Sequence, residues 1–385
     1  MEKRPVLFFE FASVDGKIRP LVFEHPKEVI LARTVGEVVP SLERIEEAVS
    51  AGYHAAGYLS YESAPAFDPA FRVREGARMP LLWFGIYEKP SETPLAGGTD
   101  PGGGYRVSDW VMPVGLDEYR EKIRAIRRAI ARGETYQINY TIRLHSVFEG
   151  DDFAYYRHLT RAQSSRCCAY LNLGRYRILS ASPELFFRLK DRTITVRPMK
   201  GTAKRGATPE EDRALAEWLY HSEKNRAENL MIVDLLRNDL NRIALPGTVR
   251  AERLFEIERY PTVHQMTSTV TARLPERAGL PDILGALFPT GSITGAPKIS
   301  SMGIIAGLEL SPREVYCGTI GYITPEREAV FSVPIRTVLL DAETGIATYG
   351  VGGGITWDST AEEEYREILI KARFLSAGGG GHVCP

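Results

Sequence analysis

The stretch RPMKGTAKRG, residues 197–206, is the feature around which the rest of this chain is organised. It follows the β-branched run TITV at 193–196, so we expect a strand that ends in a turn through two glycines. At such a turn Lys200 can point into a cleft, where burial and the neighbouring cations favour its neutral, nucleophilic form. The alternative interpretation is a solvated basic loop, which is the usual environment of a lysine.

Composition and charge are those of an ordinary soluble globular protein. The chain has 385 residues, of which 44% are hydrophobic and 25% charged, and its formal net charge is −1. No overall field therefore attracts nucleic acid or an anionic membrane, and we expect neither as a partner. The apolar run at 6–9 is too short for a signal or spanning helix, so we expect a cytoplasmic protein.

Periodicity predicts helices and strands in mixed order, without a regular βαβ alternation. The predicted helices are at 39–51, 116–132, 223–238 and 361–376. The predicted strands are at 136–144, 317–324, 330–340 and 346–351, with a hairpin around SASPE within 177–190. This order predicts an α+β sandwich and excludes a doubly wound nucleotide-binding fold.

The run PSETPLAGGTDPGGG at 90–104 has the composition of a linker. It is either a subdomain boundary or a long surface loop. We take it as the end of an N-terminal subdomain at 1–104, followed by a region at 105–376 that carries the candidate site residues. The glycine-rich residues 377–385 are predicted to be a flexible tail.

Carboxylates on two predicted helices are suited to a magnesium ion. Glu364 and Glu367 are three residues apart and Lys371 is four further on, so all three lie on one helix face. Glu228 lies on another helix among strongly apolar residues, where a lone carboxylate needs a partner. Mg²⁺ takes few protein oxygens and completes its octahedron with water and substrate. The alternative is that these are solvated helix faces.

The run PTGSITGAPK at 289–298 is not a nucleotide phosphate loop, because Ala296 and Pro297 stand where that pattern needs Gly and Lys. What remains is a glycine-rich turn into a helix, whose free N–H groups suit a carboxylate or a phosphate, with Lys298 adding charge. A helix-capping turn is the alternative.

Three other groups give only a weak indication of function when each is taken alone. Glu184 follows a proline at a turn, where a glutamate is more often a surface carboxylate than an acid or base. His264 lies in YPTVHQM, and such a residue is more often a structural histidine than a catalytic one. The run GGGIT at 352–356 can be a plain loop, although bare backbone amides there could contact a carboxylate.

Taken together, these segments resemble the chorismate-utilising enzymes, a family that includes anthranilate, isochorismate and salicylate synthases and aminodeoxychorismate synthase component I. The resemblance implies the chorismate-binding fold, a sandwich of large, mostly antiparallel β-sheets flanked by helices. The matching segments follow the family's order: TYQINYT (135–141), SASPELF (180–186), RPMKGTAKRG (197–206), RAENLMIVDLLRNDL (226–240), PTGSITGAPK (289–298), YCGTIGY (316–322), VPIRT (333–337), GGGIT (352–356) and EEEYREILIKA (362–372).

Two positions discriminate within the family. Members that add water to chorismate carry a lysine where this chain has Gln137, so the resemblance disfavours water addition. Anthranilate synthases carry an alanine where this chain has Lys200, whereas aminodeoxychorismate synthases carry a lysine. This implies amination at C4, giving 4-amino-4-deoxychorismate on the route to p-aminobenzoate and folate. The alternatives are anthranilate synthase component I and a non-catalytic subunit that binds an aromatic acid.

The resemblance also implies roles for the candidate residues. Lys200 would add at C2 while the C4 hydroxyl leaves, and ammonia would then add at C4 while the lysine departs, which restores the configuration. Glu184 would be the acid and base of these steps. The remaining expected roles are His264 and Thr294 facing the ring or the leaving group, Tyr316, Arg336, Gly352, Gly353 and Lys371 binding carboxylates, Gln137 in the substrate site, and Mg²⁺ held by Glu228 and Glu367 with Glu364 close by.

Cys167 and Cys168 lie in SSRCCAYLN, which is not a glutaminase signature. The resemblance therefore implies that a separate glutamine amidotransferase subunit supplies ammonia. It also implies that a separate aminodeoxychorismate lyase completes the synthesis of p-aminobenzoate.

Overall fold

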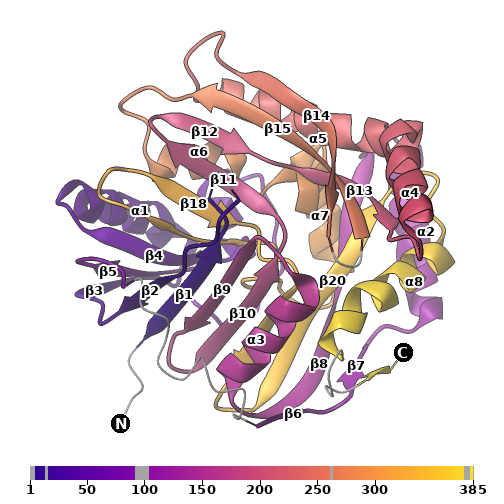
Figure 1. Ribbon diagram of the computed structural model, residues 1–385, viewed down its shortest axis with the longest axis horizontal. Coiled ribbons are helices and arrows are strands. Elements are labelled where there is room, and N and C mark those ends of the chain that lie inside the picture. Colours follow the sequence, from indigo (N-terminus) through magenta and orange to yellow (C-terminus); the bar gives the residue numbers. More distant parts are fainter. Residues whose placement is uncertain (1–4, 14–15, 92–103, 261–262, 377–381, 385) are drawn as a thin grey trace.

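Two large β-sheets pack face to face, with helices on their outer sides (Figure 1). The computed structural model describes residues 5–13, 16–91, 104–260, 263–376 and 382–384. The strand pairs are antiparallel, apart from β21 (Val383–Cys384) beside β7 (Trp110–Val111). The predicted α+β sandwich of mostly antiparallel sheets is confirmed.

The first sheet has 11 strands in the described residues. Its order is β2 (Leu21–Glu24), β1 (Val6–Phe11), β9 (Cys167–Asn172), β10 (Tyr176–Ser182), β19 (Thr337–Asp341), β20 (Ile346–Ile355), β8 (Gln137–Gly150), β7 and β21, with β6 (Tyr105–Val107) and β16 (Gly295–Ala296) also paired to β8. The long strands β8 and β20 form its central ladder, which carries Gln137 and the glycine run.

The second sheet has 10 strands in the described residues. Its order is β13 (Met199–Lys204), β15 (Val263–Arg273), β12 (Thr193–Val196), β11 (Leu185–Lys190), β18 (Ala329–Ser332), β17 (Thr319–Ile323), β4 (His54–Leu59), β5 (Leu82–Tyr87) and β3 (Glu28–Ala32), with β14 (Arg250–Arg259) also paired to β15. The strand β13, which carries Lys200, is at one edge of this sheet.

Helices cover the outer face of each sheet. The first sheet is covered by α2 (Leu116–Ala131), α3 (Asp152–Gln163) and α8 (Ala361–Ala372), and the second by α1 (Val35–Ser50), α5 (Glu223–Asn241) and α6 (Leu280–Leu287). The other helices are α4 (Pro209–His221), α7 (Lys298–Leu308) and the short η1 (Tyr61–Ala66), η2 (Gly291–Ile293) and η3 (Arg373–Leu375). None of the helices in these described ranges is both long and apolar enough to cross a membrane.

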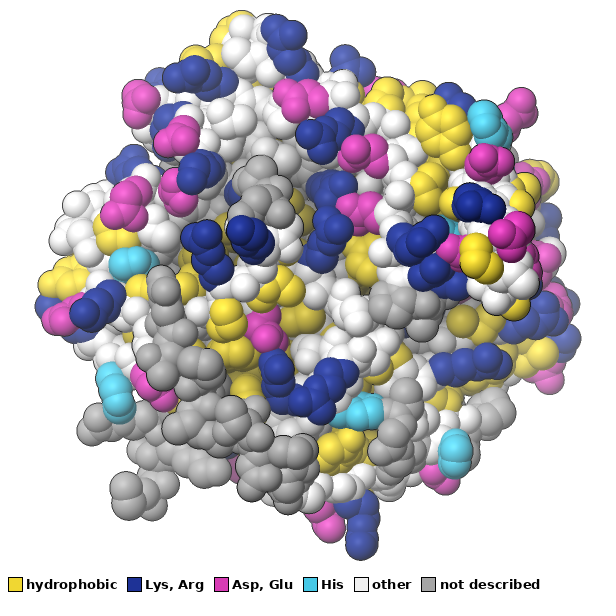
Figure 2. Space-filling view, in the orientation of Figure 1, with side chains coloured by type: hydrophobic (Ala, Val, Ile, Leu, Met, Phe, Trp, Pro, Cys, Tyr) yellow, Lys and Arg dark blue, Asp and Glu magenta, His cyan; other side chains and the backbone are white. Residues whose placement is uncertain are grey.

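Alternating side chains of the strands build the core between the sheets. In β1, Leu7 and Phe9 point toward the second sheet and contact the cluster that includes Tyr58 and Trp83, whereas Phe8 points outward to the α3 side. This is the period-two alternation of a strand that is buried on both faces. On the surface, positive and negative side chains are interspersed over the face shown in Figure 2.

The boundary predicted near residue 104 does not divide the two sheets into separate structural units. Strands before it belong to both sheets, because β1 pairs with β9 while β4 pairs with β17. Most of the predicted linker, residues 92–103, lies outside the described residues. Of the predicted flexible tail, residues 382–384 pair with β7, and residues 377–381 and 385 lie outside the described part of the chain.

Two segments that the pattern predicts as continuous β-structure are crossings between the sheets. The predicted hairpin around SASPE is wrong, because β10 belongs to the first sheet and β11 to the second. Likewise, the predicted single strand at 330–340 is β18 in the second sheet followed by β19 in the first. Each crossing contains a proline, Pro183 or Pro334, which removes a donor from the ladder.

A buried charged network lies beside the central ladder. Glu309 accepts hydrogen bonds from Arg143 Nη2 at 3.0 Å and Arg313 Nη2 at 2.7 Å, and also from Thr141 Oγ1 at 2.6 Å. The three charged side chains are at most 4% exposed. Burial raises the pKa of Glu309, but the two guanidinium groups outweigh it, so the pKa lies below its ordinary value.

We predict that Glu309→Gln lowers the free energy of unfolding by about 3–5 kcal/mol at neutral pH, because it leaves two buried guanidinium groups without their counter-charge. Urea denaturation measures this change. Since the folded pKa of Glu309 is lowered, the stabilisation is present above the unfolded pKa of about 4 and is lost as the pH falls through the folded value.

The matched control is Glu210→Gln, which removes an exposed partner of Arg213 and should change the free energy of unfolding by less than about 1 kcal/mol. Equal effects of the two substitutions would contradict the prediction.

Candidate active site

The backbone around Lys200 is bulged and held on two sides. The pairing of β13 with β15 shifts register within residues 199–202, and a bulge re-aims the side chains it carries. Asn229 Nδ2 donates to the carbonyl of Lys200 at 3.3 Å, and Gln265 Nε2 donates to the carbonyl of Gly201 at 2.9 Å. Gly201 has a φ of +92°, which glycine adopts without strain.

The amine of Lys200 meets Gln137 over Gly354, where the two sheets face each other. A Cβ placed on Gly354 would lie 2.7 Å from Lys200 Nζ and 2.3 Å from Gln137 Nε2, so the space between the three groups depends on the glycine. Gln137 is 1% exposed, and its Oε1 has no hydrogen-bond partner within the described residues. A buried amide oxygen of this kind is available to a ligand.

Several charges act on Lys200. Burial lowers the pKa of Lys200, and the positive charge of Lys371 lowers it further, whereas Glu228, Glu184 and Glu367 raise it; the net direction is down. A lowered pKa increases the fraction of neutral amine at neutral pH, which is the nucleophilic form. The structure therefore brings four of the other predicted site residues within electrostatic reach of Lys200.

Glu184 lies at the first crossing between the sheets. Its N–H donates to Ser182 Oγ at 3.1 Å, and its carbonyl accepts from Val333 N at 3.1 Å. The side chain is 5% exposed and accepts a hydrogen bond from Ser292 Oγ at 2.6 Å. Burial raises the pKa of Glu184 to about 7, although Ser292 and Lys200 act to lower it. Such a carboxyl group gains and loses a proton near neutral pH.

Two predicted metal ligands lie on α8 beside the glycine run of β20. Lys371 Nζ lies 2.5 Å from Glu367 Oε1 and donates to the carbonyl of Gly352 at 2.8 Å. A Cβ placed on Gly353 would lie 2.9 Å from Glu364 Oε2. The absence of side chains on this part of β20 therefore leaves the space into which α8 directs its carboxylates and its lysine.

Gly352 also turns its backbone groups away from β8. It is opposite Thr141, whose N–H donates to Glu309 and not to β20. Gly352 is thus in a non-hydrogen-bonded pair, and both its N–H and its C=O point away from β8. Pairing with β19 ends at Tyr349, so this N–H has no strand partner in the described part of the chain. It is available to a ligand carboxylate, as predicted for the glycine run.

The carboxylate pair fits a divalent cation. Burial raises the pKa of Glu364, and the negative charge of Glu367 raises it further, so a cation between them would relieve their repulsion. Mg²⁺ is commonly held by one or two carboxylates with water and substrate. No three His, Cys, Asp or Glu side chains among the described residues are close enough to hold a metal together. Glu228 therefore does not complete a preformed set of three ligands.

Arg336 and Tyr316 flank the same strand. Arg336 Nη1 donates to the carbonyl of Lys371 at 2.6 Å, and its guanidinium lies 5.6 Å from the ring of Phe374. Tyr316 is 7% exposed, and a Cβ placed on Gly350 would lie 2.4 Å from its ring. Both residues thus lie against β20 or the end of α8, next to the space between the sheets.

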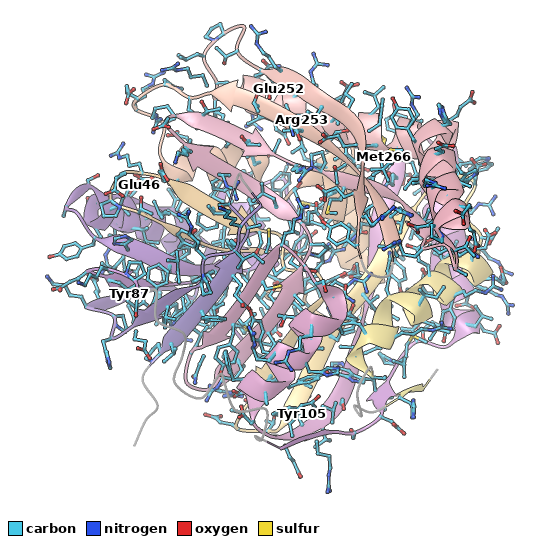
Figure 3. The ribbon with its side chains drawn as sticks, in the orientation of Figure 1. Glu46, Tyr87, Tyr105, Glu252, Arg253 and Met266 are labelled. Carbon is cyan, nitrogen blue, oxygen red and sulfur yellow. The ribbon has the colours of Figure 1, made fainter. Side chains whose placement is uncertain are left out.

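His264 lies beside α4. Its Nε2 donates to Asp212 Oδ1 of α4 at 2.9 Å, and the imidazole is buried. Met266, labelled in Figure 3, is two residues further along β15 and shares this strand face. It packs with Leu219 of α4 and Ala203. The carboxylate of Asp212 thus holds the imidazole beside α4, while its Nδ1 has no hydrogen-bond partner within the described residues. The role of His264 beside the ring or the leaving group stays a prediction.

Two groups of the glycine-rich turn that were predicted to bind a ligand, Thr294 and Lys298, form hydrogen bonds within the protein. Thr294 is fully buried, and its hydroxyl donates to the carbonyl of Thr290 at 2.9 Å. Lys298 Nζ donates to Asp239 Oδ2 of α5 at 3.3 Å. The charge predicted to serve an anion site at the start of α7 is therefore paired inside the protein, and Thr294 is left with accepting capacity only.

Three further residues of the site, Ser292, Asn229 and Gln265, were not predicted from the sequence. Ser292 lies within the run PTGSITGAPK, and Asn229 follows Glu228 directly. The signal that could have found them is their position inside segments already selected. Their function needs partners that are distant in sequence, and only folding identifies those partners.

Residues 98–377 match the family model described as chorismate binding enzyme. This chain belongs to the chorismate binding enzyme family. It is 42% identical to aminodeoxychorismate synthase component 1 of Salmonella typhimurium, over 75% of this chain and 61% of that protein. It is 35% identical to anthranilate synthase component 1 of Methanothermobacter marburgensis, over 83% and 73%. The chain spans about three fifths of the curated relatives that it matches first.

Solved structures of chorismate binding enzymes share the fold. Anthranilate synthase component I from Streptococcus pneumoniae superimposes with a TM-score of 0.75 at 25% identity, covering 97% of this chain and 92% of that one. The menaquinone-specific isochorismate synthase MenF from Escherichia coli gives 0.75 at 19% identity, covering 97% and 88%. The second likeness supports the fold alone.

We predict that Gly354→Ala reduces the chorismate turnover proposed below by about 100-fold or more, because the new methyl group displaces Lys200 Nζ and Gln137 Nε2 by distances to which catalysis is sensitive. Steady-state consumption of chorismate measures this. Gly303→Ala on α7 is the control, since nothing lies within 4 Å of its added Cβ. Full activity of Gly354→Ala would show that the lysine and the amide do not need this separation.

Proposed function

We propose that this chorismate binding enzyme aminates chorismate at C4 and forms 4-amino-4-deoxychorismate. The observation that carries the proposal is the lysine at position 200, whose partly buried amine faces Gln137 across Gly354. A water-adding enzyme needs a base for water at the position of Gln137, and a primary amide is not basic. The relatives named aminodeoxychorismate synthase component 1 support the same product.

In the first step, the neutral amine of Lys200 forms a bond to C2 of the ring. Both double bonds of the ring diene shift, from C1=C2 to C1=C6 and from C5=C6 to C4=C5. The C4–O bond breaks, and Glu184 gives its proton to the departing hydroxyl, which leaves as water. The pKa of Glu184, raised to about 7 by burial, keeps a large protonated fraction for this transfer at neutral pH. The lowered pKa of Lys200 increases the fraction of free amine at the same pH.

In the second step, ammonia forms a bond to C4, both double bonds shift back to C5=C6 and C1=C2, and the C2–N bond breaks, which releases Lys200 as the neutral amine. The ionised Glu184 accepts a proton from the new ammonium group, which returns the enzyme to its starting state. Two displacements retain the configuration at C4. Glu184 thus serves as acid and then as base.

The carboxylates of chorismate would bind to positive and N–H groups along β20 and α8. Lys371, Arg336 and the N–H of Gly352 lie on this side of the strand. The pair Glu364 and Glu367 would hold Mg²⁺, which supplies positive charge for the ring carboxylate when bound. Glu228, whose charge acts on Lys200, would be a further ligand of this ion.

Ammonia would come from a separate glutamine amidotransferase subunit, and a separate aminodeoxychorismate lyase would release p-aminobenzoate. The words "component 1" in the names of the relatives support a partner subunit. The proposal includes the cytoplasmic location that the sequence predicts.

We predict that the purified chain, given chorismate, Mg²⁺, ammonium salt at alkaline pH and an aminodeoxychorismate lyase, forms p-aminobenzoate. Lys200→Ala should lose this activity by about 100-fold or more, because it removes the proposed nucleophile. Chromatography of the products measures both results. Lys204→Ala, whose side chain is 77% exposed, is the control and should keep the activity. Anthranilate as the sole product of the unaltered chain would contradict the proposal.

We predict that Mg²⁺ raises the melting temperature of the chain in the absence of substrate, since an ion that binds the folded state stabilises it, by about 2.7 kcal/mol at 100 times Kd. Differential scanning fluorimetry measures the shift. Replacing Glu364 and Glu367 by glutamine should abolish it. Glu363→Gln, an exposed change on the same helix, should keep it, and an equal shift in all variants would exclude these carboxylates as ligands.

A further inference from the structure

One hydrogen bond joins the acid of the site to the glycine-rich turn. Ser292 Oγ donates to Glu184 Oε1 at 2.6 Å, and the two residues are 7% and 5% exposed. They are 108 residues apart in the sequence. The other carboxyl oxygen, Oε2, has no hydrogen-bond partner in the described ranges of the chain. The serine therefore occupies one oxygen and leaves the other free.

The turn that carries Ser292 is held tightly. A Cβ placed on Gly291 would lie 2.0 Å from Leu235 Cδ2 of α5, so the turn packs directly on that helix. Arg313 Nη1 donates to the carbonyl of Ile293 at 2.7 Å. A group on such a support keeps its position during a reaction.

Glu184 is also fixed through its backbone, by Ser182 on one side and Val333 on the other. With its main chain and one oxygen held, the carboxyl group has little freedom to rotate. The orientation of Oε2 is thus set by the fold and not by the substrate.

We propose that Ser292 positions Glu184 for proton transfer at C4, by binding Oε1 so that the acidic proton resides on Oε2 and points at the substrate. This inference rests on the proposed role of Glu184. In the first step the O–H bond of Oε2 breaks and the proton joins the departing hydroxyl oxygen. In the second step a proton moves from the new C4 ammonium nitrogen to Oε2. Ser292 keeps its own proton in both steps.

Two titratable groups face Glu184 from the neighbouring strands. The amine of Lys200 approaches from β13 and lowers the pKa of Glu184. The thiol of Cys167 approaches from β9, and burial raises the pKa of that thiol to about 12, so it stays neutral. Ser292 does not titrate. Removal of the Ser292 hydroxyl should raise the pKa of Glu184, since the hydrogen bond from Ser292 lowers that pKa.

The test follows chorismate consumption in Ser292→Ala at a fixed concentration of un-ionised ammonia. We expect kcat to fall about 10- to 100-fold with little change in KM, because a misplaced acid slows the chemical step more than binding. The protonated form of Glu184 is needed first, so the alkaline midpoint of kcat/KM should move to higher pH. Ser292→Thr, which retains the hydroxyl, should restore both kcat and the alkaline midpoint of kcat/KM.

Ser63→Ala is the matched control, since the Ser63 hydroxyl is also buried and donates at 2.6 Å to Ser60, away from the site. If the melting temperature shows that Ser292→Ala is unfolded, Ser292→Cys replaces it, because it keeps the volume and weakens the hydrogen bond. An unchanged kcat and midpoint, or a fall in kcat that Ser292→Thr does not restore, would overturn the proposal.

Chorismate consumption does not depend on which product forms, so product analysis tests the proposed function separately. If anthranilate is formed and the midpoint still moves in Ser292→Ala, the role of Ser292 stands and the proposed product fails. If 4-amino-4-deoxychorismate is formed and the midpoint does not move, the proposed product stands and the role of Ser292 fails.

Discussion

The site depends on hydrogen bonds between two neighbouring crossings of the chain from one sheet to the other. Ser182 Oγ donates to the carbonyl of Val333 at 2.6 Å, Val333 N donates to Glu184, and Ala181 N donates to Arg336. The crossings are buried, so their polar backbone groups must find partners within the protein. Pairing the crossings with each other achieves this. It also brings a carboxyl group and a guanidinium group to the interior of the sandwich.

A second constraint is the approach of the Lys200 side chain to β20. Lys200 Nζ and Gln137 Nε2 occupy the volume that a side chain on Gly354 would fill. The same approach removes water from the amine, which lowers the pKa of Lys200. The absence of a side chain on Gly354 therefore has a geometric consequence, the space for the amine and the amide, and an electrostatic consequence, the lowered pKa of Lys200. This explains how a lysine on an edge strand becomes a candidate nucleophile and not a solvated cation.

Burial moves the pKa values of Lys200 and Glu184 toward neutral pH from opposite sides. That arrangement supplies a free amine and a protonated acid together, as the proposed first step requires. The rigid charged network of Glu309, Arg143 and Arg313 lies behind the site and holds the turn of Ser292. The flanking residues on α8 are more exposed, with Glu367 at 53%, which suits groups that bind a solvated cation and an incoming substrate.

The sequence by itself determined the fold class, the main helices and the segments that carry Lys200, Glu184, Gln137 and the carboxylates, because periodicity and short runs are local properties. It did not show that SASPE and VPIRT are crossings, because a short β-like run reads the same whether its neighbours are in one sheet or two. Nor did it show that His264 turns to Asp212, or that Ser292 reaches Glu184. Those partners are distant in the chain, and the packing of two sheets against each other decided which of them meet.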